Sequence, residues 1–200
     1  MRRTPTSLLV LLVALVAGAC TADRVASPDP TVPTAPSTTT IAVATTAPDP
    51  FAVPATIDAA YVDRVLVELN KVYGDVGRKI RATGRYERSD LDPLGAIFNQ
   101  PLLELQVKQF ATIPEMDAAL FKNPPGDRRM TVEELITSRP DCIFAKVLFD
   151  VSAVVTNPPP AEPVYLTLRP TQPGANPKGI NTTPWSMSGE SDARQDQCVA

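Results

Sequence analysis

The side chains of this chain that could do chemistry are carboxylates, tyrosines and cysteines, because none of its 200 residues is histidine. Without histidine, Ser-His-Asp and Cys-His nucleophiles, histidine-ligated zinc and the HExxH motif are excluded. Among the carboxylates Asp150 stands out, because it interrupts a mostly apolar stretch with Lys146 and Ser152 on the same side of a strand. If helices cover that side, the three residues form a polar cluster in a pocket. If solvent covers it, they form an ordinary exposed face.

Three amphipathic rings are candidates for a pocket wall: Tyr61, Tyr73 and Trp185. Each ring combines a large apolar body with one polar atom, which suits the wall of a binding pocket and also the ordinary core of a domain. The sequence alone leaves both interpretations open.

Charge and composition exclude several classes of partner. The chain has 19 Lys and Arg against 22 Asp and Glu, a net charge of −3, so we expect no nucleic-acid partner bound through a basic surface. We expect no metal, since two cysteines without histidine make a poor zinc site. We expect no nucleotide cofactor, since the glycine-containing stretch 174–179 lacks the spacing of a phosphate-binding loop.

The first nineteen residues are typical of an export signal. Two arginines follow Met1, and an unbroken apolar run extends from Leu8 to Ala17. That run is shorter than the about 20 apolar residues of a transmembrane helix, and small residues at Ala17 and Ala19 fit a signal-peptidase site. The sequence therefore predicts a signal peptide over residues 1–19.

Cys20 follows this signal directly, and Leu15-Val16-Ala17-Gly18-Ala19-Cys20 resembles the lipobox of bacterial lipoproteins, in which the cysteine is lipidated. Lipidation of Cys20 would leave Cys142 and Cys198 free to form a disulfide in an oxidising compartment. We therefore expect a protein anchored by its lipid to the outer face of the cell membrane. The alternatives are a secreted protein with Cys20 as a free thiol, and two buried thiols or a metal pair at Cys142 and Cys198.

A Thr/Pro-rich segment separates the signal from the rest of the chain. Residues 27–50 contain six prolines and nine serines or threonines, and no Lys, Arg, Glu or aromatic residue. Such a segment buries too little apolar surface to offset the entropy of ordering it. We expect residues 20–52 to be a disordered stalk that holds a domain off the membrane, or a passive terminus if Cys20 is not anchored.

Residues 53–200 have the composition of one folded domain, with helical periodicity first and strand periodicity after it. Thr56 is the expected cap of a helix from Ile57 to Gly84, which Gly74 and Gly77 would kink or break. Shorter helices are predicted over residues 92–98, 100–111 (capped by Asn99) and 114–121. Strands are predicted over residues 130–137, 142–156, 164–169 and 183–188, with alternating apolar residues along the second. The pattern predicts an α+β fold, with helices packed on a curved antiparallel sheet.

This order of elements resembles the nuclear-transport-factor-2-like (cone) fold, and the anchor and stalk resemble those of lipoproteins exported by actinobacteria. The resemblance rests on the lipobox, the apolar stripe from Ile57 to Ile80, and residues 181–185 leading into a Trp-bearing strand. It implies that any catalysis would use a tyrosine and an aspartate inside the cone, Tyr61 or Tyr73 opposite Asp150.

These observations favour a membrane-anchored extracytoplasmic lipoprotein whose domain binds a small apolar ligand or an envelope protein without catalysis. The first alternative is a lyase or isomerase that uses the Tyr/Asp pair. The second is a structural protein of the cell envelope, which predicts no enclosed cavity. Fold resemblance by itself does not decide among them.

Overall fold

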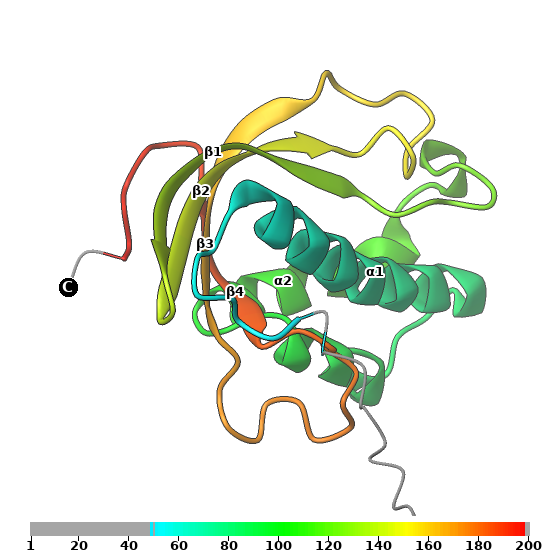
Figure 1. Cartoon of the computed structure of the whole chain (residues 1–200). Helices are drawn as coiled ribbons and strands as arrows, with labels where there is room; N and C mark the ends of the chain where they lie inside the picture. The colour runs from blue at the N-terminus through cyan, green and yellow to red at the C-terminus, as the bar shows by residue number, and fades with distance from the viewer. Residues whose placement is uncertain (1–48, 50, 199–200) are drawn as a thin grey trace, which may run out of the picture. The chain divides into compact units, whose positions relative to one another are not determined.

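The computed structural model describes residues 49 and 51–198 (Figure 1). The predicted signal peptide, the lipidation site at Cys20 and nearly all of the predicted stalk lie outside these residues. Within the described part of the chain, no helix has the length and apolar character needed to cross a membrane.

The first helix, α1, runs from Ala59 to Thr83. The cap is Asp58 and not the expected Thr56: its carboxylate accepts a hydrogen bond of 2.7 Å from the Tyr61 backbone N–H. Gly84 ends the helix at φ 64°, as predicted, in the left-handed conformation that glycine adopts without strain. The helix continues through Gly74 and Gly77, so it is not broken there.

Short helical segments follow: η1 (Arg88–Asp90), η2 (Asp92–Ala96), α2 (Leu102–Ala111), η3 (Ile113–Glu115) and η4 (Ala118–Leu120). The cap predicted at Asn99 is wrong, because α2 begins after Pro101 and no side chain caps it. Asn99 instead donates its backbone N–H to the Met187 carbonyl, at 2.8 Å. This bond ties the segment before α2 to the sheet.

Four antiparallel strands form one sheet in the order β1 (Arg129–Arg139), β2 (Cys142–Asp150), β3 (Glu162–Pro170) and β4 (Trp185–Ser191). The predicted α+β class, helices first and antiparallel strands second, is confirmed. The register of β1 against β2 shifts twice, between Val132 and Glu134 and between Leu135 and Thr137. Such bulges bend a strand, and β1 and β2 bend around α1 in Figure 1.

The predicted strand over residues 142–156 is too long, since β2 ends at Asp150. The Asp150 carboxylate accepts hydrogen bonds from the backbone N–H and the hydroxyl of Ser152, which turns the chain. Beyond this point β2 has no pairing partner, because Asp150 pairs with the first residue of β1 and Phe149 with the first residue of β3. The apolar residues beyond the turn line a pocket, as described below.

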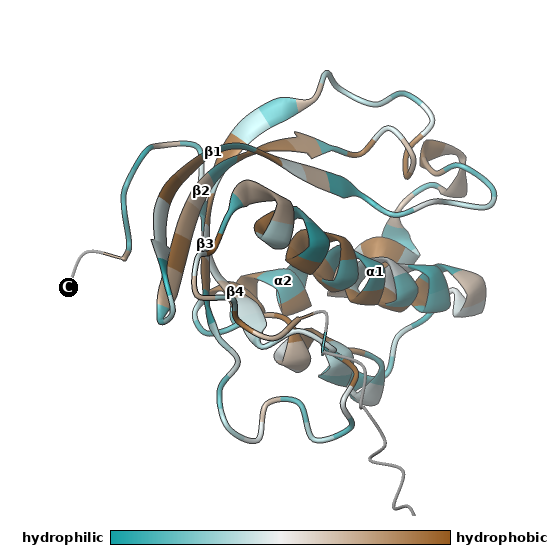
Figure 2. Ribbon diagram, viewed as in Figure 1, coloured by the Kyte–Doolittle hydropathy of each residue, from teal (hydrophilic) through white to brown (hydrophobic). Residues whose placement is uncertain are grey.

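The main core lies between α1 and one face of the sheet, and the apolar residues in Figure 2 gather toward this interface. Along β2, Ile143, Ala145 and Val147 are buried in this core, as the alternation predicts. On the opposite face, Cys142 and Phe144 form a smaller cluster with Cys198. The disulfide predicted between Cys142 and Cys198 is present and lies in this second cluster.

Candidate functional site

Tyr61 and Trp185 contact each other in the core. The Trp185 indole N–H donates to the Tyr61 hydroxyl at 2.9 Å, and that hydroxyl donates to the Phe51 carbonyl at 3.1 Å. Both rings are almost fully buried. Every polar atom of this pair therefore has a partner, which is the arrangement that a buried tyrosine or tryptophan needs for stability.

Asp150 lies at the end of β2, away from this pair. It is half-buried, and its two hydrogen bonds with Ser152 lower its pKa from the ordinary 3.8. Of its two expected companions only Ser152 is in contact, since Lys146 forms an ion pair of 2.9 Å with Glu133. No hydrogen bond joins Asp150 to Tyr61 or Tyr73 among the described residues.

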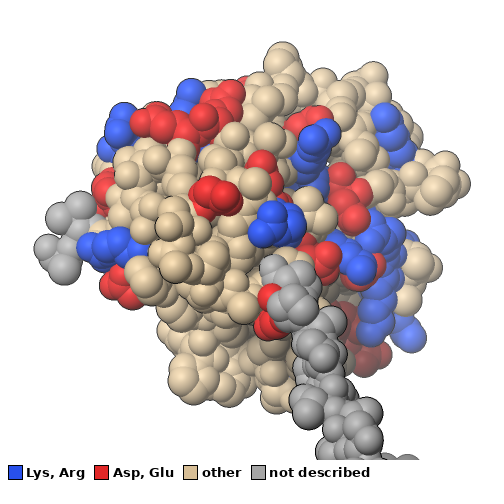
Figure 3. All heavy atoms as spheres, viewed as in Figure 1, with Lys and Arg blue, Asp and Glu red and all other residues tan. Residues whose placement is uncertain are grey.

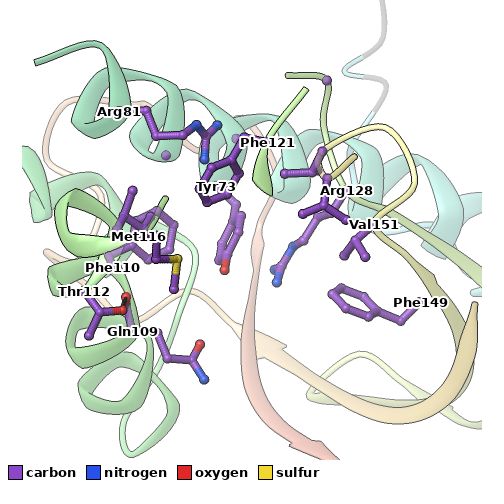
Figure 4. Close-up of a pocket in the computed structure, with 16 residues that line it drawn as sticks. Tyr73, Arg81, Gln109, Phe110, Thr112, Met116, Phe121, Arg128, Phe149 and Val151 are labelled. Carbon is purple, nitrogen blue, oxygen red and sulfur yellow. Dashed lines mark hydrogen bonds between the residues drawn. The ribbon is translucent and has the colours of Figure 1, made fainter. Parts of the chain in front are cut away.

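Tyr73, the third candidate ring, does line a pocket. This pocket has a volume of about 430 Å³ and lies between the C-terminal half of α1, the segment from α2 to Phe121, and the turn after β2. Its surroundings are shown in Figure 4. The lining is mainly apolar, with Phe110, Met116, Phe149 and Val151 among its walls. A volume and character of this kind are typical of small-molecule sites.

One wall of the pocket is formed by backbone contacts between residues 120–126 and residues 153–156. Phe121 forms an isolated bridge with Val155, and the Gly126 N–H donates to the Ala153 carbonyl at 2.8 Å. A Cβ on Gly126 would lie 3.0 Å from the Ala153 Cβ, so the close approach favours glycine. These contacts hold Val151, Val154 and Val155 against the pocket.

Arg128 is the most unusual residue of the lining, because its side chain is buried and has no carboxylate partner among the described residues (6% exposed). Its Nε donates to the Asn70 Oδ1 at 2.7 Å, and Nη2 lies 3.8 Å from the Met187 sulfur, a weak acceptor. The guanidinium carbon sits 3.5 Å from the centre of the Tyr73 ring. Burial lowers the pKa of Arg128, with smaller opposing effects from Tyr73 and then from the charge of Glu190.

Asp127, the acidic residue next to Arg128 in the sequence, does not form an ion pair with it. The Asp127 carboxylate instead pairs with Arg78, which also pairs with Asp75. Most of the other ion pairs in the described residues lie on the surface, and in Figure 3 basic and acidic side chains are interspersed over the visible face. Arg128 thus differs from the cations of these ion pairs, because it is buried and has no carboxylate within ion-pair distance among the described residues.

A second arginine, Arg81, lies elsewhere in the same lining. Its Nε is buried without a hydrogen-bond partner, and its guanidinium carbon is 4.7 Å from the centre of the Phe121 ring. Burial, and then the charge of Arg78, lowers the pKa of Arg81. Arg81 is less buried than Arg128 and also lines an outer hollow shared with Arg78 and Lys122.

On the other side of Tyr73 and Arg128 lies a second hollow, of about 440 Å³, lined by polar residues that include Gln106, Glu190 and Asp192. The main pocket differs from it in charge: the described residues that line the main pocket include two arginines and no Asp or Glu. Charge thus distinguishes the two hollows that meet at Arg128.

The importance of Arg128 was not anticipated, because the sequence presents it as half of an Arg128-Arg129 pair at the start of a strand. The alternation of inward-facing and outward-facing residues at the start of β1 nevertheless indicates that the Arg128 side chain points inward. Arg128 stands two residues before Met130, which is buried, so period two places it on the inward face. Reading the alternation backwards past the strand's start would have found it.

Comparison of the chain with protein-family models, with curated proteins and with solved structures finds no match. Groups of three or more Cys, Asp or Glu that could hold a metal ion do not occur among residues 51–198.

Proposed function

We propose that this protein is a lipid-anchored extracytoplasmic lipoprotein whose domain binds a small, largely apolar ligand without transforming it. The observation that carries the proposal is the pocket of about 430 Å³ with its mainly apolar walls. Such a pocket offers a ligand burial from water, which is the main source of affinity for apolar molecules. A purely structural role in the envelope would not require such a pocket.

Binding is proposed over turnover because of the groups that face the pocket. The lining supplies apolar surface, two arginines and the Tyr73 ring, but no carboxylate from the described residues. A Tyr/Asp mechanism needs its two groups within reach of one substrate. Asp150 is instead bonded to Ser152, and the Tyr61 hydroxyl is engaged with Phe51 and Trp185.

The proposed location rests on the lipobox-like sequence ending at Cys20, and the Cys142–Cys198 disulfide is compatible with it. Disulfides persist in oxidising compartments outside the cytoplasm. We further propose that the domain is a variant of the nuclear-transport-factor-2-like cone. The helices-first order and the bend of the sheet around α1 support this assignment (Figure 1).

The pocket is tested by native mass spectrometry of the protein after exposure to an extract of the cell envelope. We expect an added mass that is lost on denaturation. Val151→Trp places a large ring in the pocket and should abolish the added mass, whereas Val67→Trp makes the same substitution on the exposed face of α1 and should retain it. An unliganded mass throughout, or equal behaviour of the two variants, would contradict the proposal.

Anchoring is tested separately by fractionation of cells that express the full chain. Cys20→Ala removes the thiol that would carry the lipid, so the variant should move from the membrane fraction to the soluble fraction. Cys142→Ala with Cys198→Ala is the control, since it removes two cysteines that lie in the domain and should leave the protein at the membrane. Retention of the Cys20→Ala protein at the membrane would refute the lipid anchor.

A further inference from the structure

We propose that the ligand of this pocket is an amphipathic carboxylate, whose apolar body fills the pocket and whose carboxylate pairs with Arg128. The inference rests on the proposed binding function and assigns its ligand a chemical class. It starts from the fact that Arg128 is a buried cation with no carboxylate within ion-pair distance among the described residues; Glu190, whose charge acts on it, lines the polar hollow.

Burial of a guanidinium is unfavourable unless its charge and its N–H groups are compensated. Arg128 has one good acceptor, the Asn70 oxygen, and one weak one, the Met187 sulfur. Tyr73 and Phe149 contribute ring faces at 3.5 and 5.7 Å from the guanidinium carbon. Arginine carries five N–H donors, so most of them remain available to a bound carboxylate, which matches the guanidinium fork.

The pocket, and not the polar hollow behind it, is the side on which an anion is favoured. Glu190 and Asp192 line that hollow, and a carboxylate there would face like charges. The lining of the pocket contains no acid among the described residues, and its apolar walls weaken the screening of a charge pair. A carboxylate attached to an apolar body satisfies both halves of this environment.

Tyr73 adds a second donor at the same place. Its hydroxyl has no hydrogen-bond partner in the described residues, and in Figure 4 it lies beside the Arg128 guanidinium. A ligand carboxylate at Arg128 could therefore also accept from Tyr73. Arg81 is the alternative cation, but it is less buried than Arg128, so water competes more strongly for an anion there.

The test compares two probes that differ only in the head group, decanoate and decan-1-ol. Both are titrated by calorimetry at neutral pH into the full chain carrying Cys20→Ala, so that no detergent competes for the pocket. We expect decanoate to bind at least about tenfold more tightly than decan-1-ol, since a hydrogen bond to a charged group contributes more than one to a neutral group.

Arg128→Gln locates the effect. The variant should lose the preference for decanoate over decan-1-ol, and its urea midpoint, measured separately, shows that it is folded. Arg81→Gln is the matched control and should keep most of that preference. If Arg128→Gln does not fold, the two probes on the parent protein still decide the sign of the preference.

Each of the remaining outcomes contradicts a different part of the proposal. Equal affinity of the parent for both probes overturns the carboxylate assignment while leaving an apolar binding function intact. Loss of the preference in Arg81→Gln and not in Arg128→Gln overturns the placement at Arg128. Failure of both probes to bind the parent counts against the binding function itself and overturns the inference with it.

Discussion

Each half of α1 carries a tyrosine, and the two tyrosines differ in the hydrogen bonding of their hydroxyls. Tyr61, in the first half, is buried and its hydroxyl is bonded to both Trp185 and Phe51. Tyr73, in the second half, stacks on Arg128 and has no hydrogen-bond partner for its hydroxyl in the described residues. Tyr61 is part of the core, and Tyr73 lines the pocket.

The difference shows how to separate structural polar groups from functional ones in this molecule. Around Tyr61 and Trp185, which we call the closed end of the domain, each buried donor has an acceptor. The side chains of Asn181 and Thr183 next to Trp185 are likewise hydrogen-bonded. At the pocket end, around Tyr73 and Arg128, polar groups are left over: the Arg81 Nε is buried without a partner, and the Tyr73 hydroxyl and the Arg128 Nη1 have no hydrogen-bond partner among the described residues. Unmatched buried groups are uncommon in native proteins and call for a reason, which a bound ligand provides.

The largest effect is expected at the closed end. Trp185→Ala removes a buried ring and the partner of the Tyr61 hydroxyl, and should lower the free energy of unfolding by about 3–5 kcal/mol. Phe121→Ala, at the partly exposed pocket wall, should cost less than half as much. Urea denaturation measures both variants, and equal losses would remove the distinction between the two ends.

The disulfide is expected to act on stability without acting on the pocket. Cys142→Ala with Cys198→Ala opens a loop whose ends are 56 residues apart and should cost about 2–4 kcal/mol. A reducing agent should destabilise the parent by a similar amount and leave the double variant unchanged. Ligand affinity of the folded double variant should stay the same, because the bond lies in the second cluster, away from the pocket lining.

Gly77 sharpens the comparison, because here stability and binding should move in opposite directions. An added Cβ would lie 3.3 Å from Arg81 Nη1, a flexible group that can move aside, and alanine favours the helix by up to about 1 kcal/mol. Gly77→Ala should therefore raise the thermal midpoint and, by shifting Arg81 within the lining, weaken binding of decanoate and decan-1-ol by the same factor.

The matched control is Gly84→Ala. At φ 64° alanine is strained, so this variant should be less stable by about 1 kcal/mol with unchanged binding. Thermal unfolding and probe titration of both variants provide the check. A destabilised Gly77→Ala protein with full affinity would show that Gly77 serves packing and not the pocket.

The smallest effect concerns Asp150 and depends on pH. Its pKa is lowered by the Ser152 hydrogen bonds, so the ionised form stabilises the fold above about pH 4 and this contribution is lost as the pH falls through the lowered value. Asp150→Asn should be slightly less stable than the parent at neutral pH, and the two should converge in acid. Urea midpoints across this range test it, and a difference that persists at low pH would contradict the assignment.

The sequence alone predicted the α+β class, the long first helix with its cap at Gly84, the four antiparallel strands and the Cys142–Cys198 pairing. These features follow from local periodicity, from the conformational freedom of glycine and from cysteine arithmetic, so a single sequence is sufficient to find them. Tyr73 could be named as a ring for a pocket wall, but its residue type alone does not distinguish it from Tyr61.

Tertiary structure decided the rest. It shortened β2, because a strand cannot continue where its neighbours end, and it placed Val151, Val154 and Val155, predicted as strand residues, in the lining of the pocket. It also separated the two tyrosines, since partners more than a hundred residues apart determine which hydroxyl is satisfied. The charge at Arg128 stands out only in three dimensions, because Asp127, its neighbour in sequence, turns to Arg78.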